Sequence, residues 1–339
     1  MIGKFVSRDL AVDIGTATTI VYVQGKGVIL SEPTMVAVKD RGGKKIPVAF
    51  GREAKSMLGR TPEGVEVIQP VRTGVIADFD IAGLLLNHVI CKARKESGSL
   101  FRPRVVVGVP SGITEVERRA VEESIVTSGA RDVRLIEETI ASAIGCNLPI
   151  SEASASMVVD IGGGTTDIAV ISLNDIVCSV SLRQGGTNID RAIINHLRRA
   201  HKLFIGERTA ELIKITIGSA HPSFDDQRME VQGRGLSTGL PSGVVVNARE
   251  IREAIDEVLM SIVYGIKQTL ESTPPELSGD IISSGISLAG GGAMLKGLDK
   301  YLAEKLGLKV TLAADPQNAV VHGAGLCLEN RELFASVLK

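Results

Sequence analysis

Apolar residues along the chain follow two different spacings, which predict alternating strands and helices. Continuous apolar runs between turn residues, as at 104–110, 133–136 and 286–289, are typical of buried strands in a parallel sheet. Apolar residues three and four positions apart instead predict helices, which we expect at 78–97, from 114 onward, and at 141–144, 189–197, 207–217, 249–272 and 294–306. This alternation is typical of an α/β fold.

The remaining stretches have weaker patterns. Residues 24–77 consist of short strand-like pieces broken by glycine and proline, which predicts a small β-rich insertion. Residues 219–243 are rich in Gly, Ser, Asp and Pro and lack a sustained period, so we expect a loop or a small irregular subdomain. Thr114 and Glu117 have the spacing of a helix capping box, and the pair of prolines at 274–275 is expected to end the long helix before it.

One short phrase occurs twice in the chain. It reads LAVDIGTATTIV at 10–21 and MVVDIGGGTTDIAV at 157–170, and it aligns the DIG of one copy with the DIG of the other. Each copy predicts an apolar strand, a tight turn of small residues and a second apolar strand. The repetition predicts two similar half-molecules.

The residues of the repeated turn suit a phosphate and a cation. Glycine and threonine in such a turn expose backbone N–H groups and hydroxyls to an anion. Asp13 and Asp160 would repel a phosphate unless a cation lay between, and Mg²⁺ prefers oxygen ligands and keeps its waters. In one copy alone, an aspartate that caps its own turn would be the simpler interpretation. Two copies favour a Mg-nucleotide held between the two halves.

Two further groups could complete such a site. Gly290–Gly292 lies between a predicted strand and a predicted helix, where it allows either close approach of a nucleoside or close packing alone. Glu137 and Glu138 follow the strand at 133–136, and a carboxylate there could position or deprotonate a water that attacks a γ-phosphate. The alternative is an acid pair that only favours the dipole of the following helix.

Composition narrows the class of protein. The 339 residues are enough for two lobes around one site, and a net charge of −1 with 3% aromatic residues and no Trp gives nucleic-acid binding little support. The four cysteines form no CxxC pair and the five histidines show no metal-ligand spacing, so we expect reduced thiols and no histidine metal site. Because no apolar run reaches about 18 residues and no signal-peptide pattern is present, we expect a cytoplasmic protein.

Several phrases together resemble a known family. DIGTA at 13–17, LIEE at 135–138, DIGGGTT at 160–166 and LAGGG at 288–292 resemble the actin, Hsp70 and sugar-kinase ATPase superfamily. Within it, the chain resembles the MreB family of bacterial actins over about Asp9 to Glu329. That resemblance rests on GVIAD at 74–78, VPSGIT at 109–114, GERTAE at 206–211, IGSA at 217–220 and TPPEL at 273–277.

The resemblance implies a set of site residues. The two phosphate loops fall on Gly15, Thr16, Ala17, Thr18 and Thr19 and on Gly162, Gly163, Gly164, Thr165 and Thr166, the last two where the γ-phosphate is sensed. The nucleoside pocket falls on Ala210, Glu211, Leu212, Ile213 and Lys214 and on Gly290, Gly291, Gly292 and Ala293. Glu138 matches the residue that positions the attacking water, and Asp13 and Asp160 match the ligands of Mg²⁺ through water.

The chain departs from the family pattern at two positions near this site. Thr18 stands where the first loop usually has Asn, and Thr139 stands where Pro usually follows the acid pair. Thr18 keeps a hydroxyl donor on a shorter side chain, so we expect a small shift in phosphate geometry. Thr139 removes a rigid turn beside Glu138, which bears on the hydrolysis rate.

The resemblance also implies an architecture. We expect an actin-like fold of two lobes around a nucleotide cleft, each lobe an RNase H-like α/β core with a small insertion. The implied parts are a lobe I core at 1–30, 75–150 and 315–339, its insertion at 31–74, a lobe II core at 151–185 and 245–314, and its insertion at 186–244.

The implied function is that of a cytoskeletal ATPase. Such a protein binds and hydrolyses ATP with Mg²⁺ and polymerises into filaments on the inner face of the cell membrane, where they direct peptidoglycan synthesis, elongation and rod shape. Its partners would be further copies of itself, the membrane and the cell-wall synthesis proteins. Leu100 and Phe101, at a predicted loop tip, are the implied membrane contact, with the apolar-basic start Met1–Val6 as a second, although an isolated Leu-Phe pair is usually partly packed.

The alternative is a soluble sugar-kinase-like phosphotransferase of the same superfamily. It would need a catalytic base aimed at a substrate hydroxyl and a larger substrate-binding insertion. The second glycine-rich phrase and the short insertions disfavour it.

Overall fold

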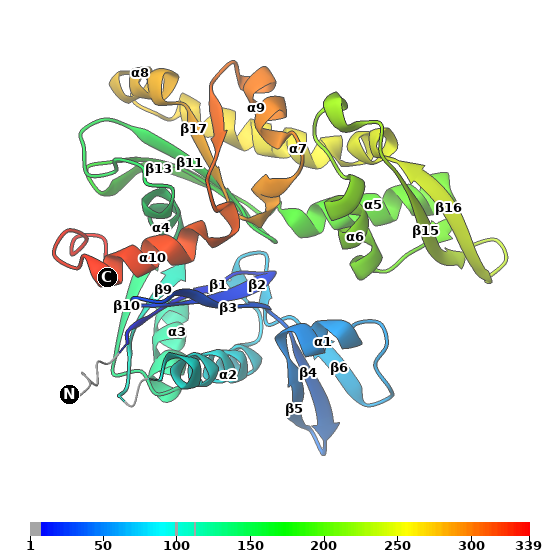
Figure 1. The fold of residues 1–339 in the computed structure, drawn as a ribbon, viewed down its shortest axis with the longest axis horizontal. Helices are drawn as coiled ribbons and strands as arrows, with labels where there is room; N and C mark the ends of the chain where they lie inside the picture. The colour runs from blue at the N-terminus through cyan, green and yellow to red at the C-terminus, as the bar shows by residue number, and fades with distance from the viewer. Residues whose placement is uncertain (1–7, 99–100, 112) are drawn as a thin grey trace.

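Two five-stranded sheets with the same strand order form the scaffold (Figure 1). The computed structural model describes residues 8–98, 101–111 and 113–339. One sheet has the order β3-β2-β1-β9-β10 and the other β13-β12-β11-β17-β18. In each, the repeated phrase forms an antiparallel hairpin whose first strand also pairs in parallel with the next strand of the sheet. The likeness of the two halves therefore extends from a short phrase to a whole sheet.

The elements have the following bounds. The strands are β1 Leu10–Ile14, β2 Thr18–Val23, β3 Gly27–Pro33, β4 Val36–Arg41, β5 Lys44–Phe50, β6 Val65–Ile68, β7 Val71–Arg72, β8 Val75–Ile76, β9 Arg104–Val109, β10 Asp132–Glu137, β11 Ser156–Ile161, β12 Thr166–Ser172, β13 Asp175–Leu182, β14 Leu203–Phe204, β15 Arg228–Gly235, β16 Pro241–Asn247, β17 Ile286–Ala289 and β18 Val310–Leu312. The helices are α1 Gly51–Met57, α2 Phe79–Ser97, α3 Glu115–Thr127, α4 Glu138–Gly145, α5 Gly186–Ala200, α6 Glu207–Ile217, α7 Ala248–Glu271, α8 Pro275–Ser284, α9 Leu298–Leu306 and α10 Ala319–Glu329, with short 3₁₀ turns η1 Pro222–Phe224, η2 Gly291–Met294 and η3 Pro316–Asn318.

The strongly periodic segments were predicted correctly. Helices α2, α3, α5, α6 and α7 and strands β9, β10 and β17 lie where the apolar spacing places them. The capping box is confirmed, since Thr114 Oγ1 accepts a hydrogen bond from the Glu117 N–H and the Glu117 carboxylate accepts one from the Thr114 N–H. A capping box can therefore be predicted from local sequence without knowledge of the tertiary structure.

Two predictions were wrong. The stretch 219–243, expected to be a loop or a small irregular subdomain, mostly forms the regular hairpin β15–β16. Only Val231 and Val246 of that hairpin are fully buried, so its apolar alternation is weak. The helix expected at 294–306 begins only at Leu298, since Gly297 adopts a left-handed conformation with φ +70° that interrupts it. The expected end of the long helix is confirmed, since α7 ends at Glu271 before the two prolines, and Pro275 then occupies the first turn of α8, where its missing N–H costs nothing.

Helices α4 and α10 lie between the two sheets and join them (Figure 1). They cross at glycines. A Cβ on Gly145 would lie 1.9 Å from the Ala319 carbonyl oxygen, and a Cβ on Gly323 would lie 1.8 Å from the Ala141 carbonyl oxygen. One hydrophobic core therefore includes side chains of both sheets and both helices, such as Val106 and Val158. The close crossing holds the two halves together at the base of the space between them.

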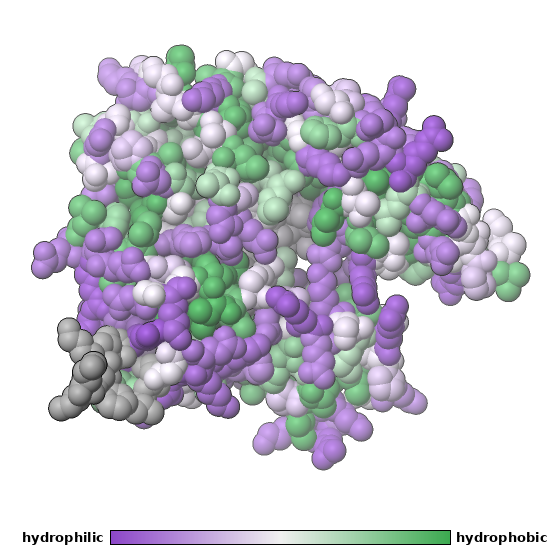
Figure 2. Space-filling model, in the orientation of Figure 1, coloured by the Kyte–Doolittle hydropathy of each residue, from purple (hydrophilic) through white to green (hydrophobic). Residues whose placement is uncertain are grey.

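Two small sheets extend from the same side of the molecule (Figure 1). Strands β5-β4-β6 with α1 extend from the first half, and β14-β15-β16 extend from the second. The face in Figure 2 is mostly hydrophilic, with hydrophobic side chains in small groups. Within the described part of the chain, no helix combines the length and the apolar character that crossing a membrane requires.

Candidate functional site

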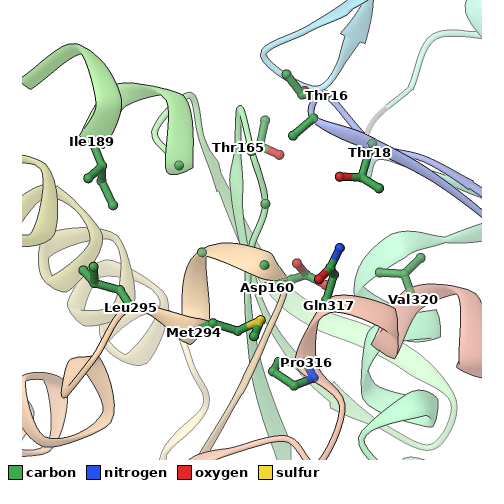
Figure 3. A pocket seen from close by; sticks show the side chains of 18 of the residues that line it. Thr16, Thr18, Asp160, Thr165, Ile189, Met294, Leu295, Pro316, Gln317 and Val320 are labelled. Carbon is green, nitrogen blue, oxygen red and sulfur yellow. The ribbon is translucent and has the colours of Figure 1, made fainter. Parts of the chain in front are cut away.

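A cavity of about 500 Å³ lies between the two halves and is lined by residues from both repeated turns. Figure 3 shows Thr16 and Thr18 of the first turn facing Thr165 of the second around one end of this space. The cavity continues past the carboxylates of Asp13 and Asp160 towards the glycines that follow β17. The duplicated phrase thus forms two facing walls of one cavity.

The two turns share one backbone conformation. The Gly15 N–H donates to the Thr18 carbonyl over 3.1 Å, and the Gly162 N–H donates to the Thr165 carbonyl over 2.8 Å. Other parts of each half bind the turn carbonyls. Gln69 Nε2 donates to the Thr16 carbonyl, while the Gly186 N–H at the start of α5 donates to the Gly162 carbonyl. With these carbonyls engaged elsewhere, small residues with N–H donors line the cavity wall, which is the arrangement an anion needs.

The two turns also touch each other. A Cβ on Gly163 would lie 2.5 Å from Ala17 Cβ, and a Cβ on Gly164 would lie 2.7 Å from Thr16 Oγ1. A third segment joins them at Gly74, whose N–H donates to Thr16 Oγ1 over 3.0 Å. The second turn therefore has to be glycine because the first turn occupies the space of its side chains.

Four carboxylates gather beneath the turns, namely Asp13, Glu138, Asp160 and Asp167. Burial raises the pKa of Asp13 to about 7, and burial is also the main reason that the pKa of Asp160 rises to about 7. The pKa of Glu138 lies well above its usual range because of burial and the charges of the three aspartates. Such a group of acids is costly to keep ionised without a cation.

The carboxylates fit a hard divalent cation. Among the described residues, Asp160 Oδ2 and Asp167 Oδ1 are buried and have no hydrogen-bond partner. Unpaired buried oxygens with raised pKa values are the ligand type that Mg²⁺ prefers, directly or through water. The residues present therefore fit such an ion, with Asp13 and Asp160 at the matching positions just before the two repeated turns.

The opposite end of the cavity is apolar. Ile189 from α5, Met294 from η2 and Leu295 lie on one side of it, and Pro316 and Val320 lie on another (Figure 3). Glycines 290–292 open this end, and a Cβ on Gly290, which has φ +82°, would lie 2.3 Å from the Ile161 carbonyl oxygen. A cavity with small N–H-bearing turns at one end and apolar walls at the other matches a molecule with an anionic and an apolar part.

The family model described as "MreB/Mbl protein" matches residues 7–336. The chain belongs to the MreB/Mbl family. It is 50% identical over 325 residues to the cell shape-determining protein MreB of Escherichia coli (strain K12), covering 95% of this chain and 94% of that protein. It is 44% identical over 326 residues to the cell shape-determining protein Mbl of Bacillus subtilis (strain 168), covering 96% and 97%.

Solved structures agree with this membership. The crystal structure of MreB5 of Spiroplasma citri bound to ADP matches with a TM-score of 0.91 at 33% identity and covers 98% of this chain and 99% of that one. A MamK double helical filament matches with a TM-score of 0.79 at 24% identity, which shows a common fold. The two-lobed actin-like α/β fold is thereby confirmed. Membership in a family of cell shape-determining proteins favours the cytoskeletal prediction over the sugar-kinase alternative.

The cavity of this MreB/Mbl family member brings together most of the predicted site residues. Those that line it are Asp13, Gly15, Thr16, Ala17, Thr18, Glu138, Asp160, Gly162, Gly163, Thr165, Glu211, Lys214, Gly290, Gly291 and Gly292. They come from the two turns, the start of α4, one face of α6 and the segment after β17.

The other predicted residues do not line the cavity, for reasons of local geometry. Side chains alternate along a strand, so Thr19 turns into the core, where its hydroxyl contacts that of Thr34, and Thr166 donates to the Gln184 carbonyl. On α6 the residues that line the cavity are Glu211 and, three and four positions further along the same face, Lys214 and Ile215. Ala210 and Ile213 are therefore buried in the core, while Leu212 is exposed. Ala293 is buried as well, and Gly164 packs against Thr16.

Sequence reasoning missed several lining residues. Asp167 is the most informative of them, because it adds a fourth carboxylate one strand position beyond a threonine pair. Asp167 comes directly after the threonine pair at the start of β12, and its alternation with Thr166, whose side chain turns away from the cavity, could have found it. The residues that line the apolar end were also missed, since apolar side chains there look like core residues in sequence; they are Ile189, Met294, Leu295, Pro316 and Val320.

Two expectations concern residues outside the cavity. Leu100, the first of the predicted membrane contacts, lies outside the described residues, as does the start at 1–6, and Phe101 is 54% exposed. Thr139, where the family usually has Pro, is buried, and its hydroxyl lies 3.2 Å from that of Ser111. This contact ties the start of α4 to the segment after β9 and so anchors the residue next to Glu138.

Proposed function

We propose that this chain binds ATP with Mg²⁺ in the cavity between its halves, hydrolyses it, and polymerises into filaments at the cell membrane. The observation that carries the proposal is the meeting of two phosphate-type turns and four carboxylates, two of them buried, in one cavity that ends in apolar walls. The MreB5 structures bound to ADP and to AMPPNP, at 33% identity, support an adenine nucleotide as the ligand.

The roles of the residues follow from their places. Backbone N–H groups of the turns around Thr16 and Gly163 would bind the phosphates, and the glycines at 290–292 would admit the nucleoside. Asp13 and Asp160 would hold Mg²⁺ through water, and that ion neutralises phosphate charge. Glu138, at the first turn of α4 and facing the same space, would orient the water that attacks the γ-phosphate.

Contacts across the opening support a link between nucleotide and lobe position. Lys55 of α1 in the first half and Glu211 of α6 in the second half form an ion pair, with 2.6 Å between Lys55 Nζ and Glu211 Oε2. Because Glu211 also lines the cavity, a nucleotide there would touch a residue that bridges the halves. This arrangement would couple closure of the lobes to assembly.

We further propose the four-part division expected from the sequence. The sheet β5-β4-β6 falls within the proposed insertion 31–74, and β14 and β15 fall within the proposed insertion 186–244. Each larger part contains one five-stranded sheet, except that the end of β3 at 31–33 runs into the first insertion, and β16 crosses the proposed boundary at 244/245. The insertions would then be the parts free to differ between filament-forming relatives.

The test is sedimentation and electron microscopy of the unaltered chain with ATP or ADP, with and without anionic liposomes. We expect filaments and pelleting that depend on the nucleotide, and recruitment of the liposomes into the pellet. A chain that stays monomeric under all conditions and transfers phosphate to a sugar would overturn the proposal. Binding of cell-wall synthesis proteins would be tested only after filaments have been observed.

The membrane part of the proposal has its own test. Phe101→Ser should reduce co-sedimentation with anionic liposomes several-fold while nucleotide binding is unchanged, because an exposed aromatic side chain contributes apolar area to a bilayer surface. Phe79→Ser is the matched control, since Phe79 is 41% exposed at the start of α2. Equal lipid binding by both variants and the unaltered chain would contradict a role for this loop.

A further inference from the structure

Two histidines and a glutamate meet far from the nucleotide cavity. His196 Nε2 lies 3.2 Å and His201 Nε2 lies 2.8 Å from the same oxygen, Oε2 of Glu250. One ligand atom from each of the three residues lies within 4.8 Å of the other two, the single such group of His, Cys, Asp and Glu side chains among the described residues. Sequence spacing gave no sign of it, because Glu250 lies 49 positions after His201.

The secondary structure holds these side chains in place. His196 lies in the last turns of α5 and His201 is the residue that caps its end. Glu250 lies in the first turn of α7, where Asn247 caps the helix and its N–H donates to Glu250 Oε1 over 2.7 Å. The carboxylate is therefore oriented by the helix cap, and its second oxygen faces both imidazoles.

The ligand set is that of a transition metal. Imidazole nitrogen and carboxylate oxygen bind Zn²⁺ at about 2.0–2.2 Å, so neighbouring ligand atoms in a tetrahedral site are about 3.3 Å apart. The two observed nitrogen-to-oxygen distances of 2.8 and 3.2 Å are close to this spacing. The side chains remain 19–26% exposed, which leaves a fourth position accessible to water.

We propose that His196, His201 and Glu250 form a binding site for a divalent transition-metal ion of the Zn²⁺ class. The site differs in kind from the carboxylate group of the cavity, because nitrogen ligands disfavour Mg²⁺ and favour Zn²⁺ or Co²⁺. A bound ion replaces the two hydrogen bonds that now join the imidazoles to Glu250.

The position of the site gives it a mechanical consequence. His201 comes just before β14, and Glu250 comes just after β16, so the three residues lie at the root of the sheet β14-β15-β16. An ion there would join the end of α5 to the start of α7 and restrain the sheet that extends from them. Occupancy would therefore raise the melting temperature and stiffen the hairpin β15–β16.

The experiment measures Zn²⁺ binding to the full chain by calorimetry in the presence of millimolar Mg²⁺, added to compete for the carboxylates of the cavity. We expect one Zn²⁺ per chain at micromolar concentration, at least tenfold weaker binding in His196→Gln and in His201→Gln, and a rise in melting temperature only where all three residues are present. His221→Gln is the matched control, because His221 Nε2 lies 3.0 Å from a carboxylate oxygen of Glu304 while its Nδ1 contacts Ser223, and no second histidine shares that carboxylate among the described residues.

Circular dichroism and metal-free melting show that each variant is folded, and the histidine variants leave the Asn247 cap of α7 intact. Co²⁺ provides a second readout, since nitrogen and oxygen ligation gives visible d–d bands without an intense thiolate charge-transfer band. Stoichiometric binding that survives in the double histidine variant, a thiolate band, or no binding to the unaltered chain at micromolar Zn²⁺ would each overturn the proposal.

Discussion

The two repeated turns share a backbone conformation but differ in the size of their side chains. The first contains Thr16 and Ala17, while the second has Gly163 and Gly164 at the matching positions. The difference arises because each turn packs against the other, with Ala17 and Thr16 filling the space that side chains on Gly163 and Gly164 would need. The side chains of the first turn occupy the space left by the glycines of the second, so the two copies of the phrase differ in a complementary way.

The helices that follow the outer strands show the same relation. Gly145 of α4 and Gly323 of α10 each approach the backbone of the other helix, so the contact is nearly symmetric. The chemistry is not symmetric. Glu138 begins α4 and faces the carboxylates, whereas the acid before α10, Asp315, has a half-exposed side chain that accepts hydrogen bonds from Asn318. We infer that the halves share the scaffold and that the first half supplies the acid for hydrolysis.

The largest expected effect follows from this asymmetry. Glu138→Gln should slow ATP turnover about 100-fold, because it removes a carboxylate that orients or deprotonates water, while nucleotide affinity stays within a few-fold. A phosphate-release assay and a nucleotide-binding titration on the same preparation separate the two quantities. Asp315→Asn is the control from the second half and should turn over normally. Normal turnover in Glu138→Gln would contradict the inference that the first half supplies the acid for hydrolysis.

The second effect concerns the stability of the nucleotide-free chain. The pKa of Asp160 is about 7 in the fold and near 3.8 in an unfolded chain, so the folded state retains a proton between these values. Stability due to this group therefore falls as the pH rises from about 4 to about 7. Asp160→Asn should raise the free energy of unfolding by about 2 kcal/mol at pH 8 and change little at pH 4.

Denaturant titrations at both pH values measure this difference. Asp13→Asn should behave alike, since burial raises the pKa of Asp13 to about 7 as well. Both variants should also lose stabilisation by Mg²⁺ with nucleotide. If either variant had a lower free energy of unfolding than the unaltered chain at pH 8, the claim that the ionised aspartate destabilises the nucleotide-free fold would be contradicted.

The third effect tests the contact between the turns. Gly163→Ala should weaken nucleotide binding about tenfold, because the new methyl group would overlap Ala17 and overpacking costs about 1–3 kcal/mol. The double variant with Ala17→Gly should recover part of the loss, which a double-mutant cycle measures. Additive losses would show that the two turns do not depend on each other.

The smallest effect concerns the departure in the first turn. Thr18→Asn restores the residue usual in the family and should change nucleotide affinity by about threefold or less, because both side chains offer a donor at the cavity. Equilibrium titration of both proteins provides the comparison. A change of tenfold or more would mean that the first turn contributes more to phosphate binding than its shape suggests.

The sequence predicted the elements with a strong local period, such as α7 and β9, and it located the cavity through a repeated phrase. It failed at the hairpin β15–β16, where few residues are buried and the alternation is weak. It also assigned runs of consecutive residues, 210–214 for example, where only Glu211 and Lys214 line the cavity. Because helical and strand periods restrict which neighbouring residues share a face, only some residues of a motif can line the cavity.

By itself the sequence determined the two hairpins, the acids that accompany them and the family, because these depend on residues close together in the chain. Only the tertiary structure decided that the second turn needs glycine, that Asp167 is a fourth carboxylate of the cavity, and that His196 and His201 meet Glu250. These facts depend on which distant segments are brought into contact, and the packing of α4 against α10 and of α5 against α7 sets those contacts.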